Sequence, residues 1–137
     1  SPAFYGIGKT CFALDYADQD KVHLGASGTL GSRATKWNGT AAVFPHQFVI
    51  DMGAPRMVNG LSVTQRSGLS RAIKNAELFT STDGVSFTAA SSYVYENLNG
   101  AQYFDFSAAK TFRYFKIAAS SAWDGLQFAS LAEVGMY

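Results

Sequence analysis

Cysteine is nearly absent from this chain of 137 residues, and the single copy, Cys11, excludes an internal disulfide bond. Cys11 lies in an apolar run that continues to Leu14, so we expect a buried and unreactive thiol. Charged residues are also few, at 15%, and the formal net charge is only +1. Such a chain has no electrostatic basis for binding nucleic acid or an anionic membrane.

Long hydrophobic runs are absent as well. No apolar stretch approaches the roughly 20 residues that a membrane-spanning helix needs. No basic and apolar leader precedes Ser1, so we expect a mature or excised piece of a larger protein. The length suits one domain, residues 1–137, with a full hydrophobic core.

The sequence also lacks the motifs of common catalytic sites. It contains no Gly-x-Ser-x-Gly elbow, no glycine-rich phosphate loop with a lysine, and no His-Glu-x-x-His. Cysteine and histidine do not occur in pairs at zinc-binding spacing. Most aspartates fall at expected turns or strand ends, where a structural role suffices. We therefore expect a protein that binds rather than catalyses.

Apolar and aromatic residues are plentiful, at 47% and 15% of the chain. They alternate with polar residues over short stretches that are separated by glycine, serine and asparagine, which is the pattern of β-strands and turns. Leu61 and Val63 alternate in this way and are expected to point inward, and an Asp83-Gly84 pair supplies a tight turn. The pattern predicts an all-β protein, a single antiparallel β-sandwich. The expected strands are 11–16, 45–52, 61–66, 76–81, 85–95 (unbroken or with a break at 89–92), 102–106, 111–119 and 128–137.

Antiparallel strands alternate in direction, so successive loops fall at opposite ends of a sandwich. Turns at 53–57, 82–84 and 107–111 are expected at one end. The longer loops 67–74, 89–101 and 120–127, together with segment 22–45, are expected at the other. Binding residues are usually carried on long loops of a rigid sheet, so this second end is the candidate site.

The residue types at that end suit a sugar. A flat aromatic ring stacks on the C–H face of a pyranose, and planar polar groups bracket neighbouring hydroxyls. Trp123 and the polar residues that follow it offer both kinds of group within one loop. Two alternatives stay open: Trp123 packs over the sandwich end, and the arginines are solvated loop charges. The expected ligand-binding residues are Arg33, Arg66, Arg71, Asn99, Trp123, Asp124 and Gln127.

Four motifs occur in an order that resembles one family. They are a hydrophobic strand ending in Asp51-Met52-Gly53, the hairpin 60–87, the strand 112–117 and the ending 131–134. Together they resemble the discoidin, or coagulation factor V/VIII type C, domains, which include the family 32 carbohydrate-binding modules. The resemblance covers nearly the whole chain in order.

The resemblance implies a discoidin-like jelly roll that binds its ligand through loops at one end. It implies an accessory domain that docks a larger secreted, cell-surface or periplasmic protein onto a glycan or polysaccharide, often of the galactose type. Relatives on the same fold bind proteins or lipids through apolar loop tips, and here Leu69, Leu98 and Leu126 keep that alternative open. A purely structural spacer is a third alternative, since fold alone does not decide function.

Many members of this family hold a structural calcium ion. By resemblance, Thr35 and Glu133 match two of its ligands. The position of the ligating aspartate aligns with Leu30, which offers no side-chain oxygen, whereas calcium takes six to eight oxygens. The sequence therefore favours a domain without a required cofactor, and Thr35 and Glu133 are the candidate ligands if calcium is bound.

Overall fold

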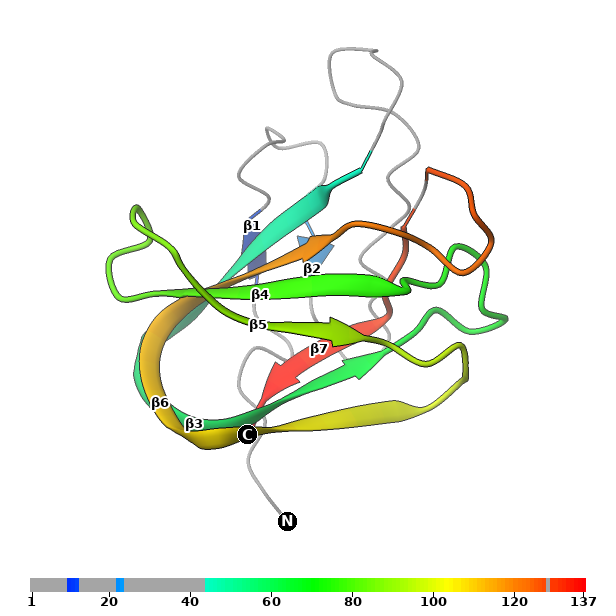
Figure 1. Ribbon diagram of the computed structural model, residues 1–137. Helices are drawn as coiled ribbons and strands as arrows, with labels where there is room; N and C mark the ends of the chain where they lie inside the picture. The colour runs from blue at the N-terminus through cyan, green and yellow to red at the C-terminus, as the bar shows by residue number, and fades with distance from the viewer. Residues whose placement is uncertain (1–9, 13–21, 24–43, 128) are drawn as a thin grey trace.

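The chain folds into β-strands joined by loops and turns. The computed structural model describes residues 10–12, 22–23, 44–127 and 129–137 (Figure 1). Within these residues there is no helix, and so no helix of the length and apolarity that a membrane span needs. The strands are β1 (Thr10–Phe12), β2 (Val22–His23), β3 (His46–Thr64), β4 (Asn75–Ser81), β5 (Thr88–Val94), β6 (Ala101–Ala119) and β7 (Glu133–Met136).

Two long strands, β3 and β6, form the backbone of the fold. Each has 19 residues, and they pair antiparallel along most of their length. His46 at the start of β3 lies opposite Ala119, and Thr64 at its end lies opposite Ala101. The register shifts between Asp51 and Arg56, and both ribbons curl over together at this end of the molecule (Figure 1). Each long strand therefore belongs to both layers of the sandwich.

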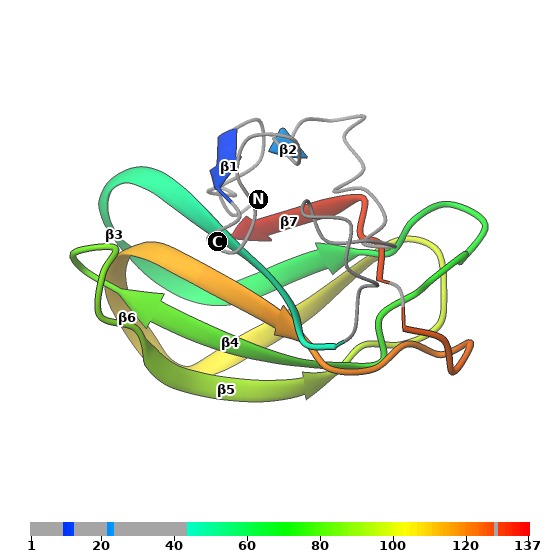
Figure 2. The same ribbon diagram turned by 90° about the horizontal axis from the view of Figure 1, so that it is seen from above.

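The remaining strands extend these two layers. The hydrogen-bonded order is β2-β1-β3-β6-β4-β5, with β7 paired to the second half of β3. Figure 2 shows β7 and the β4–β5 pair on opposite sides of the molecule. Buried side chains from both layers form one core, as expected for a β-sandwich. Core residues include Ile50, Leu78, Phe115 and Ile117 from the first layer, and Leu61, Val63, Val134 and Met136 from the second.

Several expectations from the sequence are confirmed. The all-β antiparallel sandwich is correct, and Leu61 and Val63 are fully buried. Gly84 has a φ of 77°, as its place in a tight turn requires. Asp83 shapes that turn, because its Oδ1 accepts hydrogen bonds from the N–H groups of Val85 (2.8 Å) and Ser86 (2.9 Å). These bonds lower the pKa of Asp83.

Other expectations about boundaries were wrong. The segments 53–57 and 107–111 are bends inside β3 and β6 rather than turns, because the two strands continue to pair past them. Of the two forms expected for 85–95, the unbroken strand is correct, since β5 runs from Thr88 to Val94; the expected loop 89–101 was too long, and the loop is only 95–100. The last strand begins at Glu133 rather than at 128, because Ser130 forms an isolated bridge with Ala72 instead.

Tyr95 directly follows β5 and packs in the core. Its ring lies 5.6 Å from that of Phe104 and 6.5 Å from that of Tyr93, measured between centroids. The side chain is fully buried, and within the described residues its hydroxyl has no hydrogen-bond partner. Burial raises the pKa of this phenol well above its ordinary value of 10.0.

We expect Tyr95→Phe to raise the free energy of unfolding by about 1 kcal/mol, because it removes an unpaired buried hydroxyl and keeps the ring. The wild type should also lose stability as the pH rises above about 10, where the unfolded phenol ionises and the folded one does not. Tyr95→Phe should weaken that loss.

Urea unfolding from pH 7 to 11 measures both effects. The matched control is Tyr103→Phe, which changes a phenol that is 58% exposed and should leave stability nearly unchanged. A Tyr95→Phe variant less stable than the wild type would show that the hydroxyl is needed.

Candidate functional site

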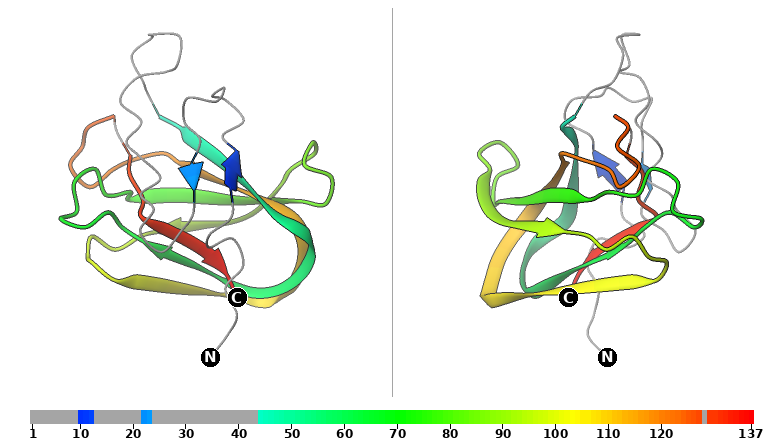
Figure 3. Two further views of the ribbon diagram at one scale, coloured as in Figure 1. Left: turned by 180° about the vertical axis from the view of Figure 1, so that it is seen from behind. Right: turned by 45° about the vertical axis from the view of Figure 1, so that its right-hand side comes forward.

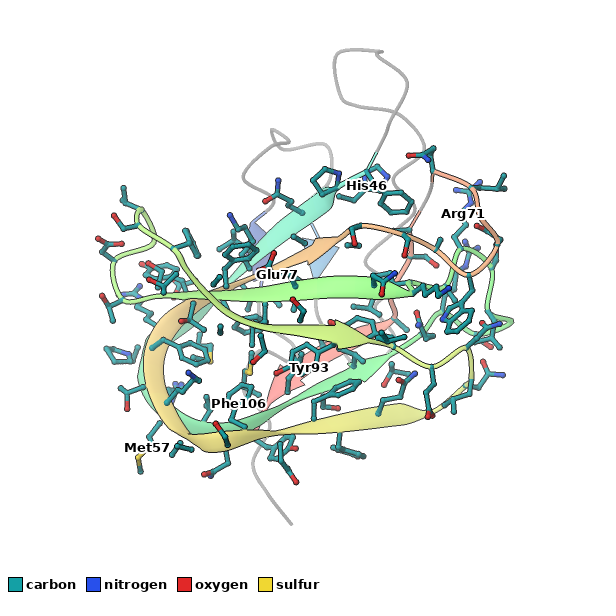
Figure 4. The ribbon with its side chains drawn as sticks, in the orientation of Figure 1. His46, Met57, Arg71, Glu77, Tyr93 and Phe106 are labelled. Carbon is teal, nitrogen blue, oxygen red and sulfur yellow. The ribbon has the colours of Figure 1, made fainter. Side chains whose placement is uncertain are left out.

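Three loops gather at the end of the sandwich away from the β3–β6 bend. They are 65–74, 95–100 and 120–127 (Figure 3), the grouping that the alternation of strand direction predicts. Figure 4 shows Arg71 at this end and Met57 at the opposite one. We call this surface the loop end.

Two buried glutamines fasten these loops to the long strands. The Nε2 of Gln65 donates to the carbonyls of Ile73 (2.8 Å) and Glu96 (3.3 Å), and its Oε1 accepts from Ile73 N–H (3.1 Å). Gln102 brackets Glu96 in the same manner, with one bond of 2.8 Å to its N–H and one of 2.8 Å to its carbonyl. The loops 65–74 and 95–100 are therefore joined at their bases.

Loop 65–74 has an unusual backbone conformation. Leu69 and Arg71 have φ values of 62° and 59°, a region that residues other than glycine rarely adopt. Tertiary hydrogen bonds hold the loop in this form: Ser130 Oγ donates to the Ser70 carbonyl (2.6 Å), and Ser130 N–H donates to the Arg71 carbonyl (2.9 Å). Backbone strain of this kind is concentrated at ligand sites, which makes this loop a candidate.

Trp123 is an exposed aromatic ring whose orientation is fixed. Its Nε1–H donates to the Tyr95 carbonyl (2.8 Å), and its backbone N–H donates to the Ala72 carbonyl (2.9 Å). The Lys74 ammonium lies 4.9 Å from the ring centroid, within range of a cation–π interaction. The side chain nevertheless remains 41% exposed. Trp123 thus presents a pre-oriented apolar surface with its polar N–H already paired.

Asp124 and Gln127 shape the same loop. Asp124 Oδ1 accepts from Leu126 N–H (2.9 Å), and Gln127 Oε1 accepts from Phe44 N–H (3.1 Å). The Gln127 carbonyl lies 2.7 Å from Nε2 of the buried His46. Each of the two predicted ligand residues therefore uses one side-chain oxygen for the loop itself, while both side chains remain exposed.

The other predicted site residues lie on the neighbouring loops. Arg66 and Arg71 are half-buried at the two margins of one loop, and Asn99 is exposed on loop 95–100. Arg33 lies outside the described residues. The structure brings six of the seven candidates to one end of the sandwich, and their contact with a ligand stays a prediction.

Sequence analysis did not single out Lys74 or Tyr95. Lys74 directly precedes β4, and only the fold places its ammonium over Trp123. Tyr95 acts through its backbone carbonyl, which carries no sequence signal.

Of the two calcium ligands suggested by resemblance, the structure describes the position of one. Thr35 lies outside the described residues, and Glu133 opens β7 opposite Thr64. Among the residues that the structure describes, no group of three or more His, Cys, Asp or Glu comes together to hold a metal. Calcium binding through Thr35 and Glu133 remains untested.

Comparison with known proteins supports the fold and the family. The model of the F5/8 type C domain matches residues 15–134. No curated protein sequence matches the chain.

Three solved structures illustrate the likeness in fold. The family 32 module of NanJ from Clostridium perfringens, in complex with galactose, has a TM-score of 0.68 and 22% identity over 98% of each chain. CpGH89CBM32-5 of the same organism, in complex with GalNAc-β-1,3-galactose, has a TM-score of 0.66 and 23% identity over 92% of this chain and 81% of its own. The family 32 module of AlyQ, with 4,5-unsaturated mannuronic acid, has a TM-score of 0.69 and 17% identity over 99% and 98%.

We expect Gln65→Met to lower the free energy of unfolding by about 2 kcal/mol, because it leaves the N–H and carbonyl of Ile73 unpaired in a buried position. It should also loosen the loop end.

Urea unfolding measures the stability, and amide hydrogen exchange measures the loops. Asn97→Ala, an exposed change in loop 95–100, is the control and should alter stability by less than about 0.5 kcal/mol. Unchanged exchange in loops 65–74 and 95–100 of the Gln65→Met variant would contradict this role.

Proposed function

Because this chain belongs to the F5/8 type C domain family, we propose that it is a non-catalytic carbohydrate-binding module that binds glycans through the loop end. Three of the structural neighbours are carbohydrate-binding modules solved in complex with sugars, and such modules are generally non-catalytic. Their sequence identities of 17–23% support a shared fold, so the ligand must be argued from the residues of this chain.

The observation that carries the proposal is the fixed and exposed ring of Trp123. A sugar loses binding energy if the protein must first order the side chain on which it stacks. Here the bond to Tyr95 and the nearby Lys74 ammonium hold the indole before any ligand arrives. The exposed part of the ring is apolar, which suits the C–H face of a pyranose.

Polar groups around the ring would supply the specificity. Guanidinium, amide and carboxylate groups bond neighbouring hydroxyls in pairs, and the loop end carries all three. In this proposal Arg66 and Arg71 reach the sugar from loop 65–74, and Asn99 from loop 95–100. Asp124 and Gln127 contribute the side-chain atoms that the loop does not use, and Arg33 joins them.

The biological role follows from the position of the site on exposed loops. A single site on exposed loops binds weakly, and avidity in a larger protein compensates. We infer that the domain is covalently linked to other domains and docks them onto glycans outside the cell or at its surface.

We expect Trp123→Ala to weaken binding to a defined glycan at least tenfold, about 1.4 kcal/mol, because the stacking surface is lost. Trp123→Phe keeps a flat ring and should retain part of the affinity. A glycan array followed by calorimetry on the hit measures both, with and without EDTA.

The control for the Trp123 variants is Val85→Ala, an exposed change in the turn at the opposite end, which should leave glycan binding unchanged.

We expect EDTA to leave glycan binding and the melting temperature of the domain unchanged, since Leu30 stands at the position of a ligating aspartate. A folded domain that binds no glycan on a broad array would contradict the proposal.

A second candidate function rests on the apolar loop tips. Leu98 and Leu126 are 37% and 54% exposed at the same end as Trp123. Exposed apolar side chains at loop tips suit insertion into a protein partner or a lipid surface.

If this function holds, the domain will sediment with neutral phosphatidylcholine vesicles, and the double variant Leu98→Asn/Leu126→Asn will abolish sedimentation. If sugar binding is the function, the same double variant will still bind its glycan. If the double variant still sediments with the vesicles, Leu98 and Leu126 are not the residues that insert into the lipid.

A further inference from the structure

A groove lies on the outer face of the first sheet, apart from the loop-end residues discussed above. Its volume is about 560 Å³, within the range of small-molecule sites. β3, β6, β4 and β5 cross this face side by side, and Figure 4 labels Glu77 in the middle of it. The lining residues are Pro45, Gln47, Asn75, Ala76, Glu77, Phe79, Ser92, Tyr93, Val94, Ala118 and Ser120.

The strand register explains how the floor is built. Glu77 on β4 pairs with Ala118 on β6 and with Ser92 on β5, and Ala118 pairs with Gln47 on β3. One row across four strands therefore offers an amide, a methyl group, a carboxylate and a hydroxyl. Residues in one row point to the same face of a sheet, so these groups converge on the same space.

Glu77 is the only charged residue in this lining. Within the described part of the chain its side chain forms no ion pair or hydrogen bond. The cation nearest in register is Lys116, opposite Phe79, and its ammonium lies 4.6 Å and 5.1 Å from the ring centroids of Phe79 and Phe87. Lys116 packs on these aromatic rings and is not part of the lining, so the Glu77 carboxylate is the charged group that a ligand in the groove meets, which favours a cationic group.

The backbone of the floor restricts the kind of ligand. Between β3, β6, β4 and the inner side of β5, the N–H and C=O groups lie in the ladders that join these strands, and only the outer side of the edge strand β5 is open. A ligand that lies on the floor is therefore recognised there by side chains. Gln47 and Ser92 supply an amide and a hydroxyl, which suit a ligand rich in hydroxyl groups. Asn75 Nδ2 and Ser120 Oγ already donate to Ser121 Oγ (2.7 Å) and to the Asn75 carbonyl (3.3 Å), so these two side chains offer mainly their acceptor oxygens. The apolar side chains of Phe79 and Val94 suit the faces of sugar rings.

We propose that this groove is a second glycan-binding site, selective for sugars that carry a free amino group. The Glu77 carboxylate pairs with the ammonium, and the amides and hydroxyls of the lining bond the ring hydroxyls. This inference does not depend on the loop-end site, because none of its lining residues is among the residues proposed to bind there.

The test is isothermal calorimetry with a glucosamine tetramer, beside the neutral N-acetylglucosamine tetramer. The wild-type domain should prefer the glucosamine tetramer. Glu77→Gln, which removes the charge and keeps the shape, should weaken that binding about three- to tenfold. Ser92→Phe, an exposed change on the edge strand, should fill the groove and weaken the binding of both tetramers.

Two controls separate this groove from other sources of binding. Glu96→Gln removes an equal charge at the loop end and should leave glucosamine binding unchanged. If Glu77→Gln has no effect, or if Glu96→Gln has the larger effect, the assignment to the groove is wrong. A lysine tetrapeptide that binds as tightly as the glucosamine tetramer would show that the groove takes any cation, which would overturn the sugar assignment. Loss of the array hit in Trp123→Ala, with glucosamine binding retained, would show two independent sites.

Discussion

The antiparallel pairing of β3 with β6 is the interaction on which the other features depend. Both strands bend together, so a single ladder crosses from one layer of the sandwich to the other. The first half of β3 and the second half of β6 belong to the first layer, where they pair with β1 and β4. The second half of β3 and the first half of β6 build the second layer, with β7 at its edge. The bends of β3 and β6 lie at one end of the sandwich, and the longer loops 65–74, 95–100 and 120–127 lie at the other.

Hydrogen bonds from buried residues hold the exposed loops of the loop end in place. Gln65 and Gln102 are buried side chains at the ends of the two long strands, and both hold Glu96 through its backbone. Tyr95, the preceding residue, is buried in the core and accepts the hydrogen bond from Trp123. The orientation of an exposed indole is thus coupled to core packing, which is why a change at Gln65 should reach the loop surface.

The residues of the loop end can be recognised from the sequence, whereas those of the groove on the sheet face cannot. Trp123 stands out in the sequence because glycine, proline, asparagine, aspartate and serine dominate turns, and a tryptophan has no role in turn geometry. Glu77 does not stand out, since a polar residue at alternate positions of a strand is ordinary. Only the register across β3, β6, β4 and β5 shows that its neighbours are an alanine, an amide and a hydroxyl rather than a lysine.

The sequence by itself determined the all-β class, the inward faces of the strands and the end at which the long loops gather. Period-two alternation and turn residues are local properties, and strand direction must alternate in an antiparallel sheet. It could not determine that 53–57 and 107–111 continue as bent strands, because pairing between segments distant in sequence decides this. The cation over Trp123 and the unpaired Glu77 were likewise decided by tertiary structure, since each depends on which side chains from other strands and loops come within a few ångströms.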